Sequence, residues 1–226
     1  MRRFALAAAL SVALVGCSSG TSGSGQATVW VTRDRGTQVM HVAKVPAGLT
    51  ALQGLDRVAK VKTRYGGRYV RAVDGVSEHG RHSWFYYVNG YLADQGSAEY
   101  RLRNGDVEWW DFRTWRDPLD DAVVVGAFPE PFRHGYGGEQ RRTVVLSVDR
   151  ELGKRIARLV GGSVARTAPA SDNVVTIVFA GAAPRRFSAE LRRPGAGSPV
   201  RFVLDARFAA RLASRPQLAR FRYSVP

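Results

Sequence analysis

Few side chains in this sequence have the chemistry for catalysis or metal binding. The chain holds one cysteine, Cys17, and four histidines. A single cysteine forms no internal disulfide, and zinc sites built on thiolates need several of them. No histidine lies in a His-Glu-x-x-His motif, and the sequence contains neither a phosphate-binding loop nor a Gly-x-Ser-x-Gly elbow. We therefore expect a protein that is not an enzyme and that needs no metal and no cofactor.

Cys17 lies at the end of a short apolar segment. Two arginines precede the apolar run 4–15, and residues 14–17 read Leu-Val-Gly-Cys. A charged start, a short apolar stretch and small residues are the parts of a secretory signal, and the run is shorter than the ~20 residues of a spanning helix. The sequence at 14–17 resembles the lipobox of bacterial lipoproteins. The resemblance implies cleavage before Cys17 and a lipid on its sulfur, which places the protein on the outer face of the bacterial cell membrane.

Positive charge is concentrated in the second half of the chain. The formal net charge is +15, and residues 119–226 carry 18 basic and nine acidic side chains. Such an excess suggests nucleic acid in a cytoplasmic protein, but the predicted export argues against a nucleic-acid partner. Anionic lipid or wall polymer fits the charge, and a solvated surface without a partner fits it equally.

We expect four segments along the chain. Residues 1–16 are the predicted signal peptide, and residues 17–26 are the predicted lipidated cysteine with a flexible Ser/Gly-rich tether. The remaining residues are enough for two small domains. A boundary at Pro118 would separate a first domain, 27–117, from a basic second domain, 118–226.

Hydrophobic periodicity predicts that the first domain is α+β. Alternating and β-branched residues predict strands at 28–32, 38–45, 69–73, 83–88 and 107–112. Leucines at helical spacing predict a helix near 49–59, with Thr50 as a possible N-cap. Asn89-Gly90 predicts a hairpin turn. We expect one helix packed across a curled mixed sheet.

The second domain is also predicted to be α+β. Strands are predicted at 122–127, 143–148, 174–179, 187–191, 200–204 and 219–225. Asp149 is expected to cap a helix that Gly161-Gly162 ends, and Asp205 is expected to cap a last helix. The order predicts a small α+β sandwich.

One stretch of the first domain combines aromatic residues with turn residues. Residues 84–90 read Trp-Phe-Tyr-Tyr-Val-Asn-Gly, and residues 105–109 read Gly-Asp-Val-Glu-Trp. Together with the upstream helix, this pattern over residues 26–116 resembles a domain of unknown function related to the C-terminal domain of transcobalamin and intrinsic factor. The resemblance implies a β-grasp-like fold. It also implies a link to the binding of cobalamin or another micronutrient, because in the animal proteins this domain closes over a corrinoid.

The aromatic strands admit two interpretations. Alternate residues of a strand face opposite sides of the sheet. One side fills the core, and the other either packs on the second domain or forms a platform for a flat ligand. The ligand-binding candidates on these strands are Trp84, Tyr86, Trp109 and Trp110.

The loop 128–138 supplies a second group of candidates. Prolines and glycines shape this loop, which also carries Phe132, His134 and Tyr136. His134 is either a surface or capping residue or a ligand of a metal or of a corrinoid cobalt.

These features predict a lipid-anchored binding protein outside the cytoplasm. It would capture a small molecule, with a corrinoid as the specific hypothesis, for a transporter permease in the membrane. The alternative is an envelope module that binds protein or wall polymer through its basic second domain and has no role in transport.

Overall fold

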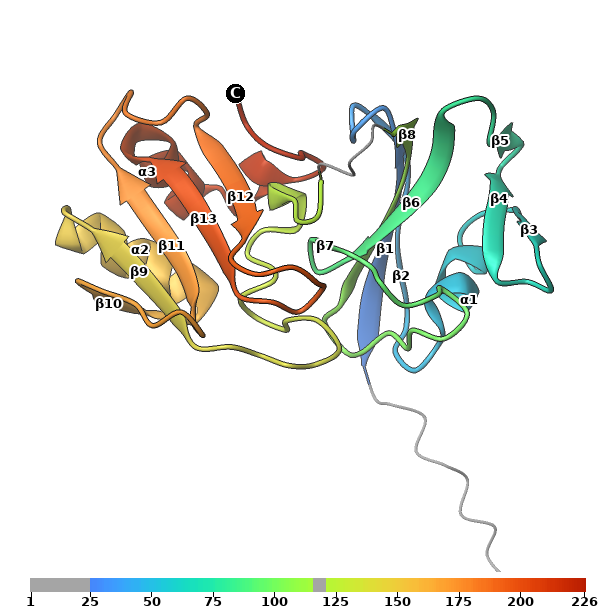
Figure 1. The fold of residues 1–226 in the computed structure, drawn as a ribbon, viewed down its shortest axis with the longest axis horizontal. Coiled ribbons are helices and arrows are strands. Elements are labelled where there is room, and N and C mark those ends of the chain that lie inside the picture. Colours follow the sequence, from blue (N-terminus) through green and yellow to red (C-terminus); the bar gives the residue numbers. More distant parts are fainter. Residues whose placement is uncertain (1–24, 116–120) are drawn as a thin grey trace, which may run out of the picture.

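The protein is built from two sheet-based units that lie side by side along its longest dimension (Figure 1). The structure, a computed structural model, describes residues 25–115 and 121–226. We call these ranges the N-terminal unit and the C-terminal unit. Both contain helices and strands, which confirms the predicted α+β class. Cys17 and the predicted boundary at Pro118 lie outside the described residues.

The N-terminal unit is centred on a mixed five-stranded sheet. Its strand order is β2-β1-β8-β6-β7, in which β1 and β8 are parallel and the other neighbours antiparallel. The alternation that predicted these strands is visible in their burial. The bounds are β1 Gln26–Arg33, β2 Gln38–Pro46, β6 His82–Val88, β7 Tyr91–Leu92 and β8 Val107–Thr114.

One short helix and a small antiparallel sheet cover one face of this sheet. The helix, α1 (Ala51–Asp56), begins at Thr50, which forms a capping box with Gln53 as the sequence suggests. Ala51 and Leu55 are buried, which docks α1 against the sheet. The small sheet has the order β3-β4-β5, with β3 Val61–Arg64, β4 Tyr69–Val73 and β5 Val76–Ser77.

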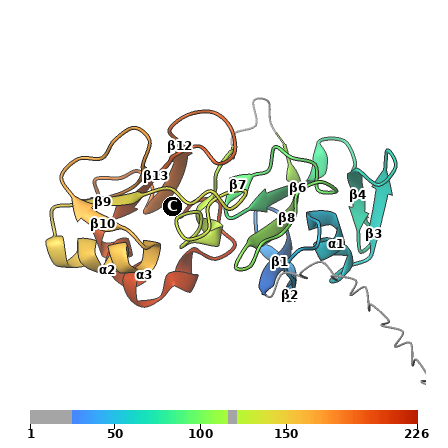
Figure 2. The ribbon, with the colours of Figure 1, turned by 90° about the horizontal axis from the view of Figure 1, so that it is seen from below.

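The C-terminal unit has a five-stranded sheet with both helices on one face (Figure 2). Its order is β10-β9-β11-β13-β12, and only β12 is antiparallel to its neighbour. Asp149 caps α2, Gly161 ends it with a φ of 65°, and Asp205 caps α3, all as predicted. The bounds are β9 Thr143–Ser147, α2 Arg150–Val160, β10 Ser163–Ala165, β11 Asn173–Val178, β12 Phe187–Leu191, β13 Val200–Asp205 and α3 Ala206–Ser214.

The predicted strand at 122–127 is wrong. This segment forms the 3₁₀ turn η1, Val125–Ala127, preceded by a single bridge from Val123 to Tyr91. A short apolar run fits several buried structures, so periodicity alone does not identify a strand. Gly126 of this buried turn packs closely against the Trp109 ring. A Cβ on residue 126 would lie 2.4 Å from a ring atom of Trp109.

The predicted strand at 219–225 is also wrong. The chain instead forms the 3₁₀ turn η2, Pro216–Ala219, and continues as an irregular segment that meets the C-terminal sheet only through the Phe187–Val225 bridge. This segment packs Phe221 and Tyr223 against the N-terminal unit. Its apolar residues therefore pack between the two units and do not form a strand of the sheet.

Within the two described ranges, no helix has the length and apolar character needed to cross a membrane.

Candidate functional site

The Asn and Asp of the two sequence motifs lie together at the junction of the units. The buried Asn89 donates from Nδ2 to Asp106 Oδ1 at 2.8 Å and to the Gly135 carbonyl at 2.7 Å. Its Oδ1 accepts from the Val107 amide at 2.8 Å. A buried side chain that satisfies three partners fixes their relative positions. Asn89 and Asp106 therefore attach the loop 128–138 of the C-terminal unit to the N-terminal sheet.

The same loop is braced by Glu130 and His134. Glu130 is buried and accepts from the His134 amide at 2.9 Å, and its Oε1 lies 2.6 Å from His134 Nδ1. Burial raises the pKa of Glu130, and the bonds from His134 oppose that rise. The His134 ring covers Gly105, since a Cβ there would lie 2.4 Å from Nε2. His134 thus holds the loop in shape, one of the two roles that the sequence left open.

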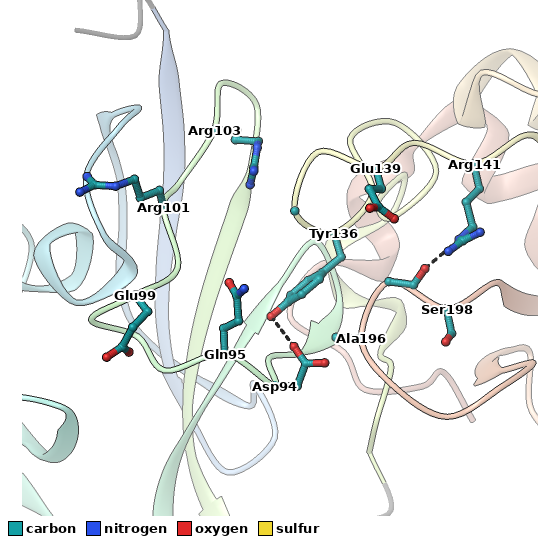
Figure 3. Close-up of a pocket in the computed structure, with 12 residues that line it drawn as sticks. Asp94, Gln95, Glu99, Arg101, Arg103, Tyr136, Glu139, Arg141, Ala196 and Ser198 are labelled. Atoms are coloured by element: carbon teal, nitrogen blue, oxygen red, sulfur yellow. Dashed lines mark hydrogen bonds between the residues drawn. The ribbon is translucent and has the colours of Figure 1, made fainter. Parts of the chain in front are cut away.

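A polar cleft opens where this loop meets the N-terminal unit. We call it the junction cleft; its volume is about 630 Å³. Figure 3 shows Tyr136 between side chains of the two units, with Arg101 and Glu99 pointing away from Tyr136. The N-terminal unit contributes the connection between β7 and β8, and the C-terminal unit contributes two loops. The polar lining residues are Asp94, Gln95, Glu99, Arg101, Arg103, Tyr136, Glu139, Arg141 and Ser198.

Two arginines of the junction cleft are held by backbone carbonyls. Arg101 donates to the Gly48 carbonyl at 3.1 Å, and Arg141 donates to the Gly197 carbonyl at 2.7 Å. No ion pair among the described residues joins two members of the lining, although it contains three acids and three arginines. Glu99 pairs instead with Arg68, outside the cleft. Charges of both signs therefore remain available to a ligand.

Tyr136 connects the two walls of the cleft. Its hydroxyl donates to Asp94 Oδ1 at 3.0 Å, and its ring packs on Tyr91 and Tyr100. Burial raises the pKa of Tyr136, so the hydroxyl stays protonated at neutral pH. Burial likewise raises the pKa of Tyr100 to about 12. The neutral phenols supply hydrogen bonds without adding charge.

The candidates on the aromatic strands lie inside the protein. Trp84 and Trp110 are buried on the face that α1 and the small sheet cover, and Tyr86 stacks on Trp110 with ring centroids 4.9 Å apart. The Tyr86 hydroxyl donates to the Gln95 carbonyl, behind the cleft wall. Trp109 is fully buried on the opposite face. These rings fill the core and the contact between units, which is the first of the two interpretations of the strands.

A network of buried polar groups closes the rest of the contact between units. The Tyr223 hydroxyl donates to Asp111 Oδ2 at 2.8 Å and accepts from Arg113 Nε at 3.0 Å. Arg113 also donates to the Tyr87 hydroxyl at 3.1 Å, and its guanidinium lies 4.1 Å from the centre of the Phe85 ring. Because these groups are buried and paired, they favour one fixed arrangement of the two units.

Of the residues predicted to bind a ligand, only Tyr136 lines the junction cleft. Phe132 is fully buried against Phe202 of the C-terminal sheet, and His134 lies outside the lining. Cys17 is outside the described residues. Sequence reasoning missed the charged lining residues, which have no motif. The sequence feature that could have pointed to these residues is the irregular connection 93–106, because long connections inside a compact domain are often functional.

Most side chains that line the junction cleft are polar or charged. Its lining contains no histidine and no cysteine. Among the described residues, no group of three or more His, Cys, Asp or Glu side chains is arranged to hold a metal ion. What the cleft offers is a set of hydrogen-bond donors and acceptors with both signs of charge, which fits a polar small molecule.

Comparison with known proteins identifies part of the N-terminal unit. Residues 48–114 match DUF4430, a domain of unknown function, which confirms that part of the sequence-based resemblance. No curated protein matches the chain.

One similar solved structure is a protein from Ruminococcus gnavus ATCC 29149 whose name proposes metal binding. The match covers 41% of this chain and 99% of the Ruminococcus chain, with 14% sequence identity and a TM-score of 0.33. Haptocorrin in complex with Cbi covers 41% of this chain, with 17% identity and a TM-score of 0.35. The chain spans 25% of the haptocorrin chain.

Proposed function

We propose that this protein is a binding protein that captures a polar small molecule in the junction cleft. The observation that supports the proposal is the cleft itself: six charged side chains from both units line about 630 Å³ without pairing with one another. Charged side chains that surround a concave space and do not neutralise one another favour a ligand that brings complementary groups. The protein has no role as an enzyme in this proposal.

The lipid anchor gives the binding protein its location. Cleavage before Cys17 and lipidation of its sulfur hold the protein on the outer face of the bacterial cell membrane, and residues 18–24 connect it to β1. Two or more acyl chains anchor a protein stably, whereas one does not. From this position the protein passes its ligand to a membrane permease.

A corrinoid is the specific ligand in this proposal. The support is the sequence resemblance of residues 84–90 and 105–109 to the transcobalamin type of domain. The amide groups around a corrinoid ring donate and accept hydrogen bonds, as the lining of the junction cleft does. The candidate tryptophans of the aromatic strands, Trp84, Trp109 and Trp110, are buried. In this proposal the contact is therefore made by polar side chains and not by stacking on these rings.

Calorimetric titration with cobinamide and cobalamin tests the ligand. The protein is the chain from residue 18, which contains every described residue. We expect saturable binding that R103M/R141M weakens about tenfold or more, since two charge-assisted hydrogen bonds are lost. R57M/R71M is the matched control, because both arginines are exposed and lie outside the lining. Absence of binding to either corrinoid contradicts the corrinoid proposal.

A further inference from the structure

A second groove lies on the C-terminal unit, between α2 and the edge strand β10. Its volume is about 710 Å³. We call it the β10 groove. Residues of α2 form one wall, and Ser163, Val164 and Arg166 form part of the other. The groove is separate from the junction cleft, since the two share no lining residue. It therefore requires its own explanation.

The β10 groove carries a row of positive charge. Arg150, Lys154 and Arg158 are exposed at successive i, i+4 positions of α2, so they form one stripe along the helix. Arg166 adds a fourth cation at the end of β10. Lys154 pairs with Glu151 at 2.6 Å, whereas the other three cations form no ion pair among the described residues. No acidic residue belongs to the lining.

The groove also runs along an open sheet edge. β10 is the outermost strand of its sheet and pairs only with β9 among the described strands. The outer edge of such a strand presents backbone N–H and C=O groups that a further strand can pair with. Two apolar side chains adjoin it: Val164 is half-buried, and Val148 is 74% exposed. Backbone pairing, apolar contact and positive charge are thus offered together.

The spacing of the charges matches an extended chain. Successive i, i+4 residues of a helix are about 6 Å apart along its axis. Alternate residues of a strand are about 6.6 Å apart and face the same side. An added strand beside β10 can therefore place an acidic side chain opposite each cation of α2.

We propose that the β10 groove binds an acidic peptide segment in extended conformation, which adds to the sheet beside β10. Main-chain hydrogen bonds give such complexes affinity, and the side chains on one face give specificity. A phosphate polymer is disfavoured because it only accepts hydrogen bonds at neutral pH, which leaves the carbonyls of the β10 edge unpaired. The partner is thus a protein with an acidic strand, and it does not depend on the ligand of the junction cleft.

The test uses a fluorescent peptide with the sequence Thr-Glu-Val-Glu-Val-Glu-Thr and the chain from residue 18. We expect saturable binding, measured by anisotropy, that R150Q/R158Q weakens about fivefold or more. R207Q/R211Q removes the same charge from exposed positions of α3 outside the groove, and it should change the affinity little. A peptide with proline in place of both valines keeps its charge but loses amide donors, so it should bind weakly.

Hydrogen exchange on the unaltered protein gives an independent readout. The bound peptide should slow amide exchange in Ser163–Ala165 and leave α3 unchanged. Polyphosphate is tested beside the peptides. Five results would overturn the proposal: no binding, equal loss in both double variants, equal binding of the proline peptide, equal binding of polyphosphate, or binding without protection of β10. An equal loss would show diffuse charge attraction, and binding of polyphosphate would show a polymer site.

Discussion

Asn89 does more than form a turn, because its side chain also bonds the two units to each other. It has a φ of 50°, a region that asparagine tolerates better than most residues, and it bonds to groups of both units. The sequence predicted the hairpin turn at Asn89-Gly90 but not the bonds to Asp106 and Gly135, because the loop 128–138 is distant in sequence.

Asn89→Ala should destabilise the protein by about 3 kcal/mol or more, because two buried partners and one half-buried partner lose a hydrogen bond and alanine disfavours the positive φ. Urea unfolding measures the change in free energy of unfolding. Asn104→Ala, which removes an exposed bond to the Gln26 amide, is the control and should cost under about 1 kcal/mol. Equal costs for the two variants would show that Asn89 does not attach the loop.

Glu108 is a buried acid beneath α1 and should make stability depend on pH. Burial raises its pKa well above the usual value, and the hydrogen bond from Trp110 Nε1 opposes this. Its Oε2 finds no hydrogen-bond partner within residues 25–115 and 121–226. Because the pKa of Glu108 is raised in the folded state, its protonated form contributes to the free energy of unfolding. This contribution is complete below the unfolded pKa of about 4.3 and is lost as pH rises through the folded pKa.

Glu108→Gln should therefore gain stability relative to the unaltered protein as pH rises, by up to about 1.4 kcal/mol per pH unit across that interval. Urea unfolding between pH 4.5 and 8 measures the difference. The exposed Glu190→Gln is the control for the removal of one carboxylate. If the Glu108→Gln difference is independent of pH, Glu108 is not the group that titrates.

The helices and central strands were predictable because local chemistry determines them. Thr50, Asp149 and Asp205 cap their helices as expected, and Gly161 ends α2. The short strands β3, β5, β7 and β10 were missed, since two to four residues give too little alternation to detect. Segments 122–127 and 219–225 were wrongly predicted as strands because their apolar residues pack between the units. Hydrophobic periodicity does not show whether an apolar residue packs within its own sheet or against another unit.

Gly54 shows how α1 is fitted to the sheet. In an exposed helix, a change from glycine to alanine stabilises by about 1 kcal/mol. Here the new Cβ would lie 2.7 Å from both Glu108 Oε2 and Leu102 Cδ1. Gly54→Ala should thus destabilise the protein by about 1–3 kcal/mol, measured by thermal or urea unfolding.

The same substitution in a Glu108→Ala background separates the clash from helix propensity. Removal of the Glu108 carboxyl should reduce the cost of Gly54→Ala, since one of its two close contacts is gone. A gain in stability from Gly54→Ala in the unaltered protein would contradict this packing of α1.

Across the whole molecule, the contact between units decides which residues are available for function. The sequence left open whether one aromatic face would pack on the second domain or form a ligand platform. In the structure, the rings of Trp30, Trp109, Phe221 and Tyr223 lie at the contact between units. The charged lining of the junction cleft could not be predicted, because it forms only when the connection 93–106 and residues 136–141 come together. Individual charged residues in loops carry no pattern in the sequence.

The membrane location is a separate prediction that Cys17→Ala tests. The variant should remain uncleaved by the lipoprotein signal peptidase and should take up no fatty-acid probe, since no sulfur remains for lipidation. Gel mobility and probe fluorescence in bacterial cells measure both effects, with the unaltered chain as the labelled control. Continued labelling of the variant would contradict the anchor.

Native mass spectrometry shows whether the junction cleft holds a ligand without naming it in advance. The chain from residue 18 is exposed to a small-molecule extract of bacterial culture, beside the variants R103M/R141M and R57M/R71M. We predict a discrete small-molecule adduct on the unaltered protein and on R57M/R71M, and its loss from R103M/R141M. Absence of an adduct, or an adduct that R103M/R141M retains in full, would contradict ligand capture in the junction cleft.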